Sequence, residues 1–119
     1  MAIPTALLRR FYVRNSLQNN DEGFSFKLTN RIAPTTLVSL GPVEIDGALY
    51  APDQLTVISN HPRSATDIRE GSPLFLPIGK KILLSLMPNQ LKQGNHHVVL
   101  HAVTLEVGPV MIEFDDAIT

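Results

Sequence analysis

The amino-acid sequence predicts an all-β protein, an antiparallel β-sandwich or jelly-roll-like fold of about seven to eight strands. Several segments alternate apolar and polar residues with the period of two that a half-buried strand requires. Turn signals separate these segments at short intervals, and no long segment has helical periodicity. The chain has 119 residues, 44% of them hydrophobic and 18% charged, so residues 1–119 are expected to form a single domain around a hydrophobic core.

The first expected element is a β-hairpin near the N-terminus. The segment "GFSFKLTN" (residues 23–30) alternates Phe24, Phe26 and Leu28 with polar residues. The preceding segment "RFYVRNSLQN" (residues 10–19) is rich in β-formers, and "NNDEG" (residues 19–23) is typical of a turn. Together these segments predict two paired strands.

A second hairpin is expected in "GPVEIDGALYAP" (residues 41–52). Asp46-Gly47 favours a two-residue type I′ turn, which needs a positive φ at both positions. Such a turn pairs Ile45 with Ala48 and Val43 with Tyr50, and this register keeps the apolar side chains on one face.

The remaining strands are expected on either side of a long irregular loop. Residues 59–79 contain three prolines and two glycines, and loops of this length usually have a functional or partner-binding role. Within the loop, Ser64 is placed to cap one helical turn. Strands are predicted in "QLTVIS" (residues 54–59), "KKILLSLMP" (residues 80–88), "HHVVLHAVTLEV" (residues 96–107) and "GPVMIEFDD" (residues 108–116).

Composition and charge exclude several classes of protein. A net charge of −1 argues against a nucleic-acid binder, which needs a basic surface. The absence of cysteine excludes disulfides and thiolate chemistry. Neither a signal peptide nor an apolar run long enough to span a membrane is evident, so we expect a cytoplasmic protein that does not bind a membrane.

Charge is unevenly distributed along the chain. The basic residues up to position 31 outnumber Asp21 and Glu22, whereas no Lys or Arg follows Lys92. Two interpretations stay open: ordinary solvated surfaces or termini brought together, and a polarised surface that orients a partner. The early basic residues are Arg9, Arg10, Arg14, Lys27 and Arg31, and the late acidic ones are Glu106, Glu113, Asp115 and Asp116.

Three of the four histidines lie within six residues, at His96, His97 and His101. On a strand, His97 and His101 share a face but lie roughly 13 Å apart along it, too far to chelate one zinc ion together. No sequence spacing connects a histidine to a carboxylate or a nucleophile in a known catalytic arrangement. We therefore expect no catalytic, cofactor-binding or metal-binding residue in this chain.

Neither face of the histidine-rich strand is polar, although a strand with one solvated face should have a polar side. The strand is therefore either a central strand beneath the long loop or a surface covered by another chain, and the two are compatible. We expect six residues to contact a partner: His61, Arg63 and Phe75 in the loop, and His97, Val99 and His101 on the strand.

Three short patterns resemble a known family. They are Gly23-Phe24-x-Phe26, Val43-x-Ile45-Asp46-Gly47 and Leu91-x-x-Gly94-x-His96-x-Val98, and their order is similar to that in the small β-sandwich (beta) subunit of the C-glycoside deglycosidases. The resemblance implies the non-catalytic subunit of a bacterial carbon–carbon lyase that cleaves 3-keto C-glycosides by elimination. It also implies a hetero-oligomer with a TIM-barrel large subunit, similar to sugar isomerases, that holds a divalent metal, typically manganese.

Two other functions stay open at this point. One is a self-associating sandwich module that binds a carbohydrate or another small ligand, although the chain has no Trp and few aromatic residues for stacking on sugars. The other is a small metal-dependent enzyme that uses His96, His97 or His101.

Overall fold

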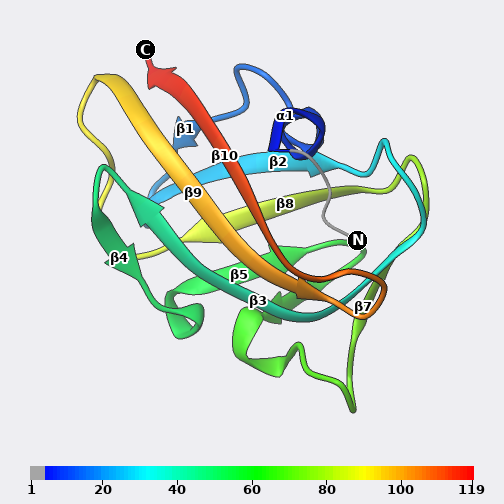
Figure 1. The fold of residues 1–119 in the computed structure, drawn as a ribbon. Helices are drawn as coiled ribbons and strands as arrows, with labels where there is room; N and C mark the ends of the chain where they lie inside the picture. The colour runs from blue at the N-terminus through cyan, green and yellow to red at the C-terminus, as the bar shows by residue number, and fades with distance from the viewer. Residues whose placement is uncertain (1–4) are drawn as a thin grey trace.

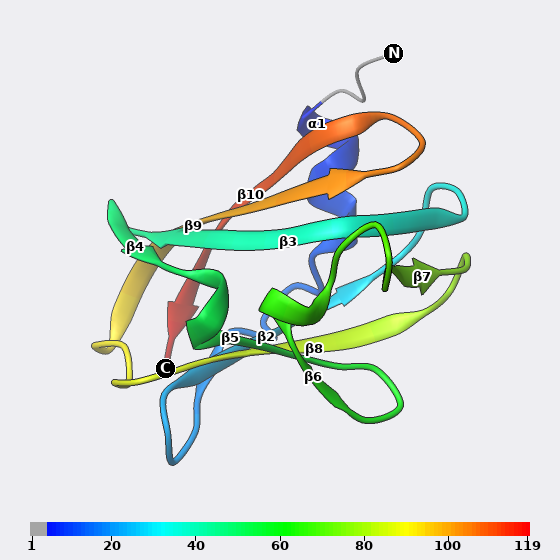
Figure 2. The ribbon, with the colours of Figure 1, turned by 90° about the horizontal axis from the view of Figure 1, so that it is seen from below.

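The protein is a β-sandwich in which two antiparallel sheets pack face to face (Figures 1 and 2). The structure, a computed structural model, describes residues 5–119. Residues 1–4, part of the N-terminal segment in which no signal peptide is expected, lie outside this range. One sheet, here called the β8 sheet, has the order β1-β2-β8-β5-β6, with β1 Gln18–Asn19, β2 Phe24–Thr29, β8 Lys81–Leu86, β5 Leu55–Ile58 and β6 Pro62–Ser64.

The other sheet, here called the β9 sheet, contains the long strands. Its order is β10-β9-β3-β4, with β7 also paired to β3; the strands are β10 Gly108–Ile118, β9 Gly94–Thr104, β3 Thr35–Ile45, β4 Ala48–Tyr50 and β7 Leu74–Leu76. The all-β class and the antiparallel pairing are confirmed. Two of the ten strands within residues 5–119, β6 and β7, have only three residues each and lie where the sequence predicts an irregular loop.

The hairpin between β3 and β4 has the predicted register. Ile45 pairs with Ala48 and Val43 pairs with Tyr50. Asp46 and Gly47 have φ values of 52° and 88°, as a type I′ turn requires. The turn sequence therefore determined both the turn type and the pairing.

The prediction of a strand over residues 10–19 is largely wrong. The chain instead forms a short helix α1, Thr5–Leu8, and a 3₁₀ turn η1, Arg9–Phe11, before the two-residue strand β1. Phe11 is buried in the core, and Tyr12 makes only an isolated bridge to Leu28. The apolar side chains here serve to close the sandwich beside β10 rather than to extend a sheet (Figure 1).

The loop over residues 59–79 is partly ordered by short elements. A 3₁₀ turn η3, Ala65–Asp67, begins after Ser64, whose side chain accepts a hydrogen bond from the Thr66 amide, as the predicted cap requires. A similar 3₁₀ turn η2, Pro52–Gln54, precedes β5. No helix among residues 5–119 is long and apolar enough to cross a membrane.

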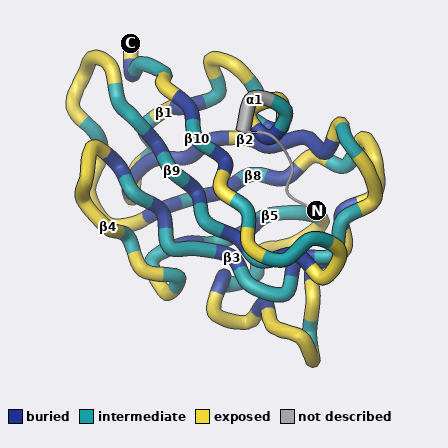
Figure 3. Tube along the Cα trace, viewed as in Figure 1, coloured by how far each residue is buried: buried dark blue, intermediate teal, exposed yellow. Residues whose placement is uncertain are grey.

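The core lies between the sheets and is built from the inward side chains of both. Phe24, Phe26, Leu84 and Val98 are fully buried, and each such side chain contributes about 1.5–3 kcal/mol of burial free energy. In β9, buried and half-buried residues alternate from His97 onward, so this strand has an inner and an outer face (Figure 3). Gly23, which directly precedes β2, must be a glycine because a side chain there would collide with the Leu86 carbonyl oxygen.

Candidate functional site: a histidine–carboxylate face

The outer face of the β9 sheet gathers histidines and carboxylates from three adjacent strands. β9 pairs with β10 on one side and with β3 on the other, so Val99 lies between Glu44 of β3 and Glu113 of β10. In the next pairs along β9 and β10, His97 opposes Asp115 and His101 opposes Met111. We call this surface the histidine face; it consists of Glu44, His97, Val99, His101, Met111, Glu113 and Asp115.

His97 is held between two carboxylates of β10. Its Nδ1 lies 2.7 Å from Asp115 Oδ1, and its Nε2 lies 2.6 Å from Glu113 Oε2. Only an imidazolium can donate a hydrogen bond from both ring nitrogens. The bond to Asp115 raises the pKa of His97 most, partial desolvation opposes this, and Glu113 raises the pKa further. The pair of carboxylates therefore stabilises a cation at the centre of the face.

His101 makes a similar cross-strand pair on the other side of Val99. Its Nε2 lies 2.7 Å from Glu44 Oε2, and both side chains are about one-third exposed. Val99 is half-buried and Met111 is 45% exposed, so apolar atoms lie between the polar pairs. The face thus alternates apolar and charged groups, as protein contact surfaces often do.

His96 points to the opposite side of β9 and fastens the β3–β4 turn. Its Nδ1 lies 2.7 Å from Asp46 Oδ2, and its Nε2 lies 2.6 Å from the Lys92 carbonyl oxygen. The Lys92 carbonyl raises the pKa of His96 most, partial burial opposes it, and Asp46 raises it further. Asp46 also accepts a hydrogen bond from the His97 amide, and this bond is the main cause of its lowered pKa. His96 therefore has a structural role on the other side of β9 from the histidine face.

The geometry of His96 and His97 favours a binding or structural role over acid–base catalysis. Both ring nitrogens of His96 and of His97 have acceptors within 2.7 Å, so neither ring offers a free nitrogen to a substrate or a metal. Among residues 5–119, no three His, Asp or Glu side chains converge closely enough to hold a metal ion.

The three predicted loop residues lie together but not on the histidine face. His61, Arg63 and Phe75 line one open hollow of about 290 Å³ with Lys80, and no residue of the histidine face lines it. The Arg63 guanidinium donates to the carbonyl oxygens of Asp67, Ser72 and Pro73 at 2.9–3.3 Å, which orders the loop internally. Phe75 is 56% exposed. The six predicted contact residues therefore form two separate groups.

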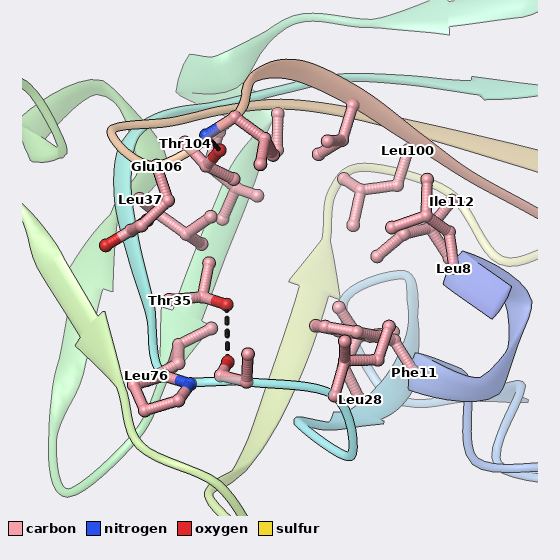
Figure 4. Close-up of a pocket in the computed structure, with 17 residues that line it drawn as sticks. Leu8, Phe11, Leu28, Thr35, Leu37, Leu76, Leu100, Thr104, Glu106 and Ile112 are labelled. Carbon is pink, nitrogen blue, oxygen red and sulfur yellow. Dashed lines mark hydrogen bonds between the residues drawn. The ribbon is translucent and has the colours of Figure 1, made fainter. Parts of the chain in front are cut away.

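An apolar cavity of about 90 Å³ lies between the sheets, beneath the β9–β10 turn (Figure 4). Leu8, Phe11, Leu100 and Ile112 line its walls, and Glu106 stands at its rim. The Thr36 amide donates to Glu106 Oε1 at 2.9 Å, and this bond is the main cause of the lowered pKa of Glu106. Its bonding to the backbone indicates a structural role for Glu106, which fastens the turn to β3.

Sequence reasoning missed the carboxylate partners of the histidines. The sequence did allow one of these pairs to be predicted. A hairpin that turns over Leu105, Glu106 and Val107 places Asp115 opposite His97. The partners of His101 and His96 could not be found in the same way. Glu44 and Asp46 reach β9 through the pairing of β3 with β9, a long-range contact that no local pattern encodes.

Comparison with known proteins corrects the family suggested by the sequence. Residues 7–119 match the family model described as the N-terminal domain of hydroxymethylglutaryl-CoA reductase, an oxidoreductase. The resemblance to a C-glycoside deglycosidase subunit is therefore wrong, as are the lyase activity and the related function inferred from it. No match was found among curated proteins.

The structure explains why the resemblance misled. Gly23 avoids a collision with Leu86, Asp46-Gly47 makes a type I′ turn, and Gly94 has a φ of 117°. These requirements belong to the backbone of a sandwich and carry no information about a reaction. Since the matched family model covers nearly all of its length, the chain belongs to the hydroxymethylglutaryl-CoA reductase N-terminal domain family.

Proposed function

We propose that this chain is a non-catalytic module of a hydroxymethylglutaryl-CoA reductase and that it docks onto the rest of that reductase through the histidine face. The observation that carries the proposal is the ordered row of cross-strand pairs on the outer face of the β9 sheet, with Val99 and Met111 between them. Membership of this family supports the rest of the reductase as the partner.

The charge of the face indicates the chemistry of its partner. Glu44, Glu113 and Asp115 contribute three carboxylates, and His97 contributes one cation when protonated. The face therefore stays acidic at neutral pH, and it complements a basic surface. Such complementarity accelerates encounter and fixes orientation more than it adds affinity.

The fixed geometry of the face favours tight docking. His97 is held at both ring nitrogens and His101 at one, so these side chains lose little rotamer freedom when a partner covers them. Each flexible side chain immobilised at an interface would otherwise cost about 0.5–1.5 kcal/mol. Apolar contact with Val99 and Met111 can then contribute directly to affinity.

The test is a binding measurement between this chain and the remaining part of the reductase from the same organism. Two methionines provide matched variants, because Met111 is 45% exposed on the histidine face and Met87 is 41% exposed after β8, away from it. We expect Met111→Lys and the double variant H97A/H101A each to weaken binding at least about tenfold, and Met87→Lys to leave it unchanged. Equal binding by all variants would overturn the proposed surface.

A further inference from the structure

A second polar hollow, of about 400 Å³, lies on the opposite edge of β10 from β9. Its lining comes from η1, from the residues that follow it, and from the end of β10. The lining residues are Arg9, Arg10, Tyr12, Arg14, Phe114 and Asp115. We call this hollow the arginine pocket.

The backbone that carries the arginines is fastened to β10. The Tyr12 ring stacks on Phe114 with ring centroids 3.6 Å apart and planes 8° apart. The Tyr12 hydroxyl donates to Asp116 Oδ2 at 2.5 Å, and the Asn15 amide donates to the same oxygen at 2.8 Å. Arg9 Nε donates to the Glu113 carbonyl oxygen at 3.2 Å. The three arginines therefore extend from an ordered segment rather than from a loose terminus.

The carboxylates nearest the pocket already have other partners. Asp115 accepts from His97, and Asp116 accepts from Tyr12 and Asn15. Within residues 5–119, every direct ion pair involves a histidine, so the three guanidinium groups lining the pocket make no direct ion pair, and the charge of Arg14 acts on Asp116 only from a distance. Three arginines line the hollow together with one carboxylate, Asp115, and this excess of positive charge attracts anions.

We propose that the arginine pocket binds a phosphorylated small molecule through a diphosphate-like group. Planar guanidinium groups bind phosphate oxygens through two parallel hydrogen bonds, which a lysine ammonium cannot reproduce. The hollow is polar, open and lined by several arginines, which suits a multiply charged group better than a single carboxylate. The pocket adjoins the histidine face and shares Asp115 with it, but its arginines lie outside that face, so the proposal does not depend on docking to the reductase.

The test is a calorimetric titration of the whole chain with inorganic pyrophosphate, with citrate as a carboxylate of similar charge. We expect saturable binding of pyrophosphate and weaker binding of citrate. The double variant R10Q/R14Q should lose at least about tenfold in affinity, and Arg31→Gln, at an exposed arginine outside the pocket, should bind as the unaltered chain does.

A further variant separates hydrogen-bond geometry from charge. R10K/R14K keeps the charge and removes the planar donors, so its affinity should fall between those of the unaltered chain and R10Q/R14Q. The substituted arginines are exposed to solvent, so these variants should remain folded. Unfolding curves recorded before the titration check this for each variant. The proposal is overturned if pyrophosphate shows no saturable binding, if citrate binds equally well, or if Arg31→Gln weakens binding as much as R10Q/R14Q.

Discussion

The His97 imidazole and the Asp115 carboxylate face each other from directly opposed positions on β9 and β10, with Nδ1 and Oδ1 2.7 Å apart. Glu113 accepts from the other ring nitrogen. Because both contacts require a proton on the ring, the pair connects the protonation state of the histidine face to the stability of the β9–β10 hairpin.

This arrangement predicts how stability depends on pH. The pKa of His97 is raised in the folded chain, chiefly by Asp115. Its contribution to stability is therefore fully present below the unfolded-state pKa and is lost as the pH rises through the folded-state pKa. Ring-proton NMR should show His97 titrating above the ordinary histidine range, and Asp115→Asn should move the midpoint down. Asp67→Asn, which changes an exposed acid far from His97 in the sequence, is the control; an unchanged midpoint in D115N would contradict the assignment.

A second prediction concerns the tyrosine that closes the sandwich beside β10. Burial, with the hydrogen bond to Asp116, raises the pKa of Tyr12 to about 12. The chain has two tyrosines and no tryptophan, so a Tyr50→Phe variant reports Tyr12 alone by its absorbance at alkaline pH. The folded variant should ionise near 12, and the same variant in denaturant near 10. Ionisation near 10 in the folded variant would mean that the Tyr12 hydroxyl is not held as the structure shows.

Substitutions at two adjacent buried polar residues should change the free energy of unfolding in opposite directions. The Asn30 side-chain amide donates to the carbonyl oxygens of Ala33 at 2.8 Å and Leu76 at 2.7 Å, whereas within residues 5–119 the buried Thr29 hydroxyl has no hydrogen-bond partner. Asn30→Ala should lower the free energy of unfolding by about 2–3 kcal/mol, because it removes two hydrogen bonds and leaves the buried Leu76 carbonyl oxygen without this donor. Thr29→Val should leave it unchanged or raise it by about 1 kcal/mol, because it removes an unpaired buried hydroxyl. Denaturant unfolding of both variants measures these changes, and a destabilised T29V would show that the hydroxyl is satisfied.

A third buried position tests the packing between the sheets. Leu84 is fully buried, whereas Leu105 in the β9–β10 turn is 69% exposed. Leu84→Ala should cost about 2–5 kcal/mol of unfolding free energy, and Leu105→Ala less than about 0.5 kcal/mol. Similar values for the two variants in urea unfolding would contradict the assignment of the core.

The parts of the fold that sequence could predict are those controlled by neighbouring residues. Asp46 and Gly47 determine a turn and its register, and the alternation in β9 separates the face of His97 from that of Val98. Residues 10–19 misled because apolar side chains in a β-rich segment were assigned to a strand, although Phe11 fills the core from η1. Strands β6 and β7 are too short to leave a periodic pattern.

Only part of the histidine face could be predicted from the sequence. Placing His97 and His101 on one face follows from strand parity alone. Pairing His101 with Glu44 needs the contact between β3 and β9, which a bulged register near Gly41 shifts away from simple counting. The arginine pocket depends on the packing of η1 against β10, and the uneven distribution of charge along the sequence was the only sign of it.

Docking through the histidine face is tested most directly by NMR of methionine methyl groups during titration with the remaining part of the reductase. Met111 lies on the face and Met87 lies after β8, and a Met→Leu substitution at each position assigns its signal. Docking through this face should shift or broaden the Met111 signal in proportion to the bound fraction and leave the Met87 signal in place. A bound complex in which Met111 is unperturbed would contradict docking through this face.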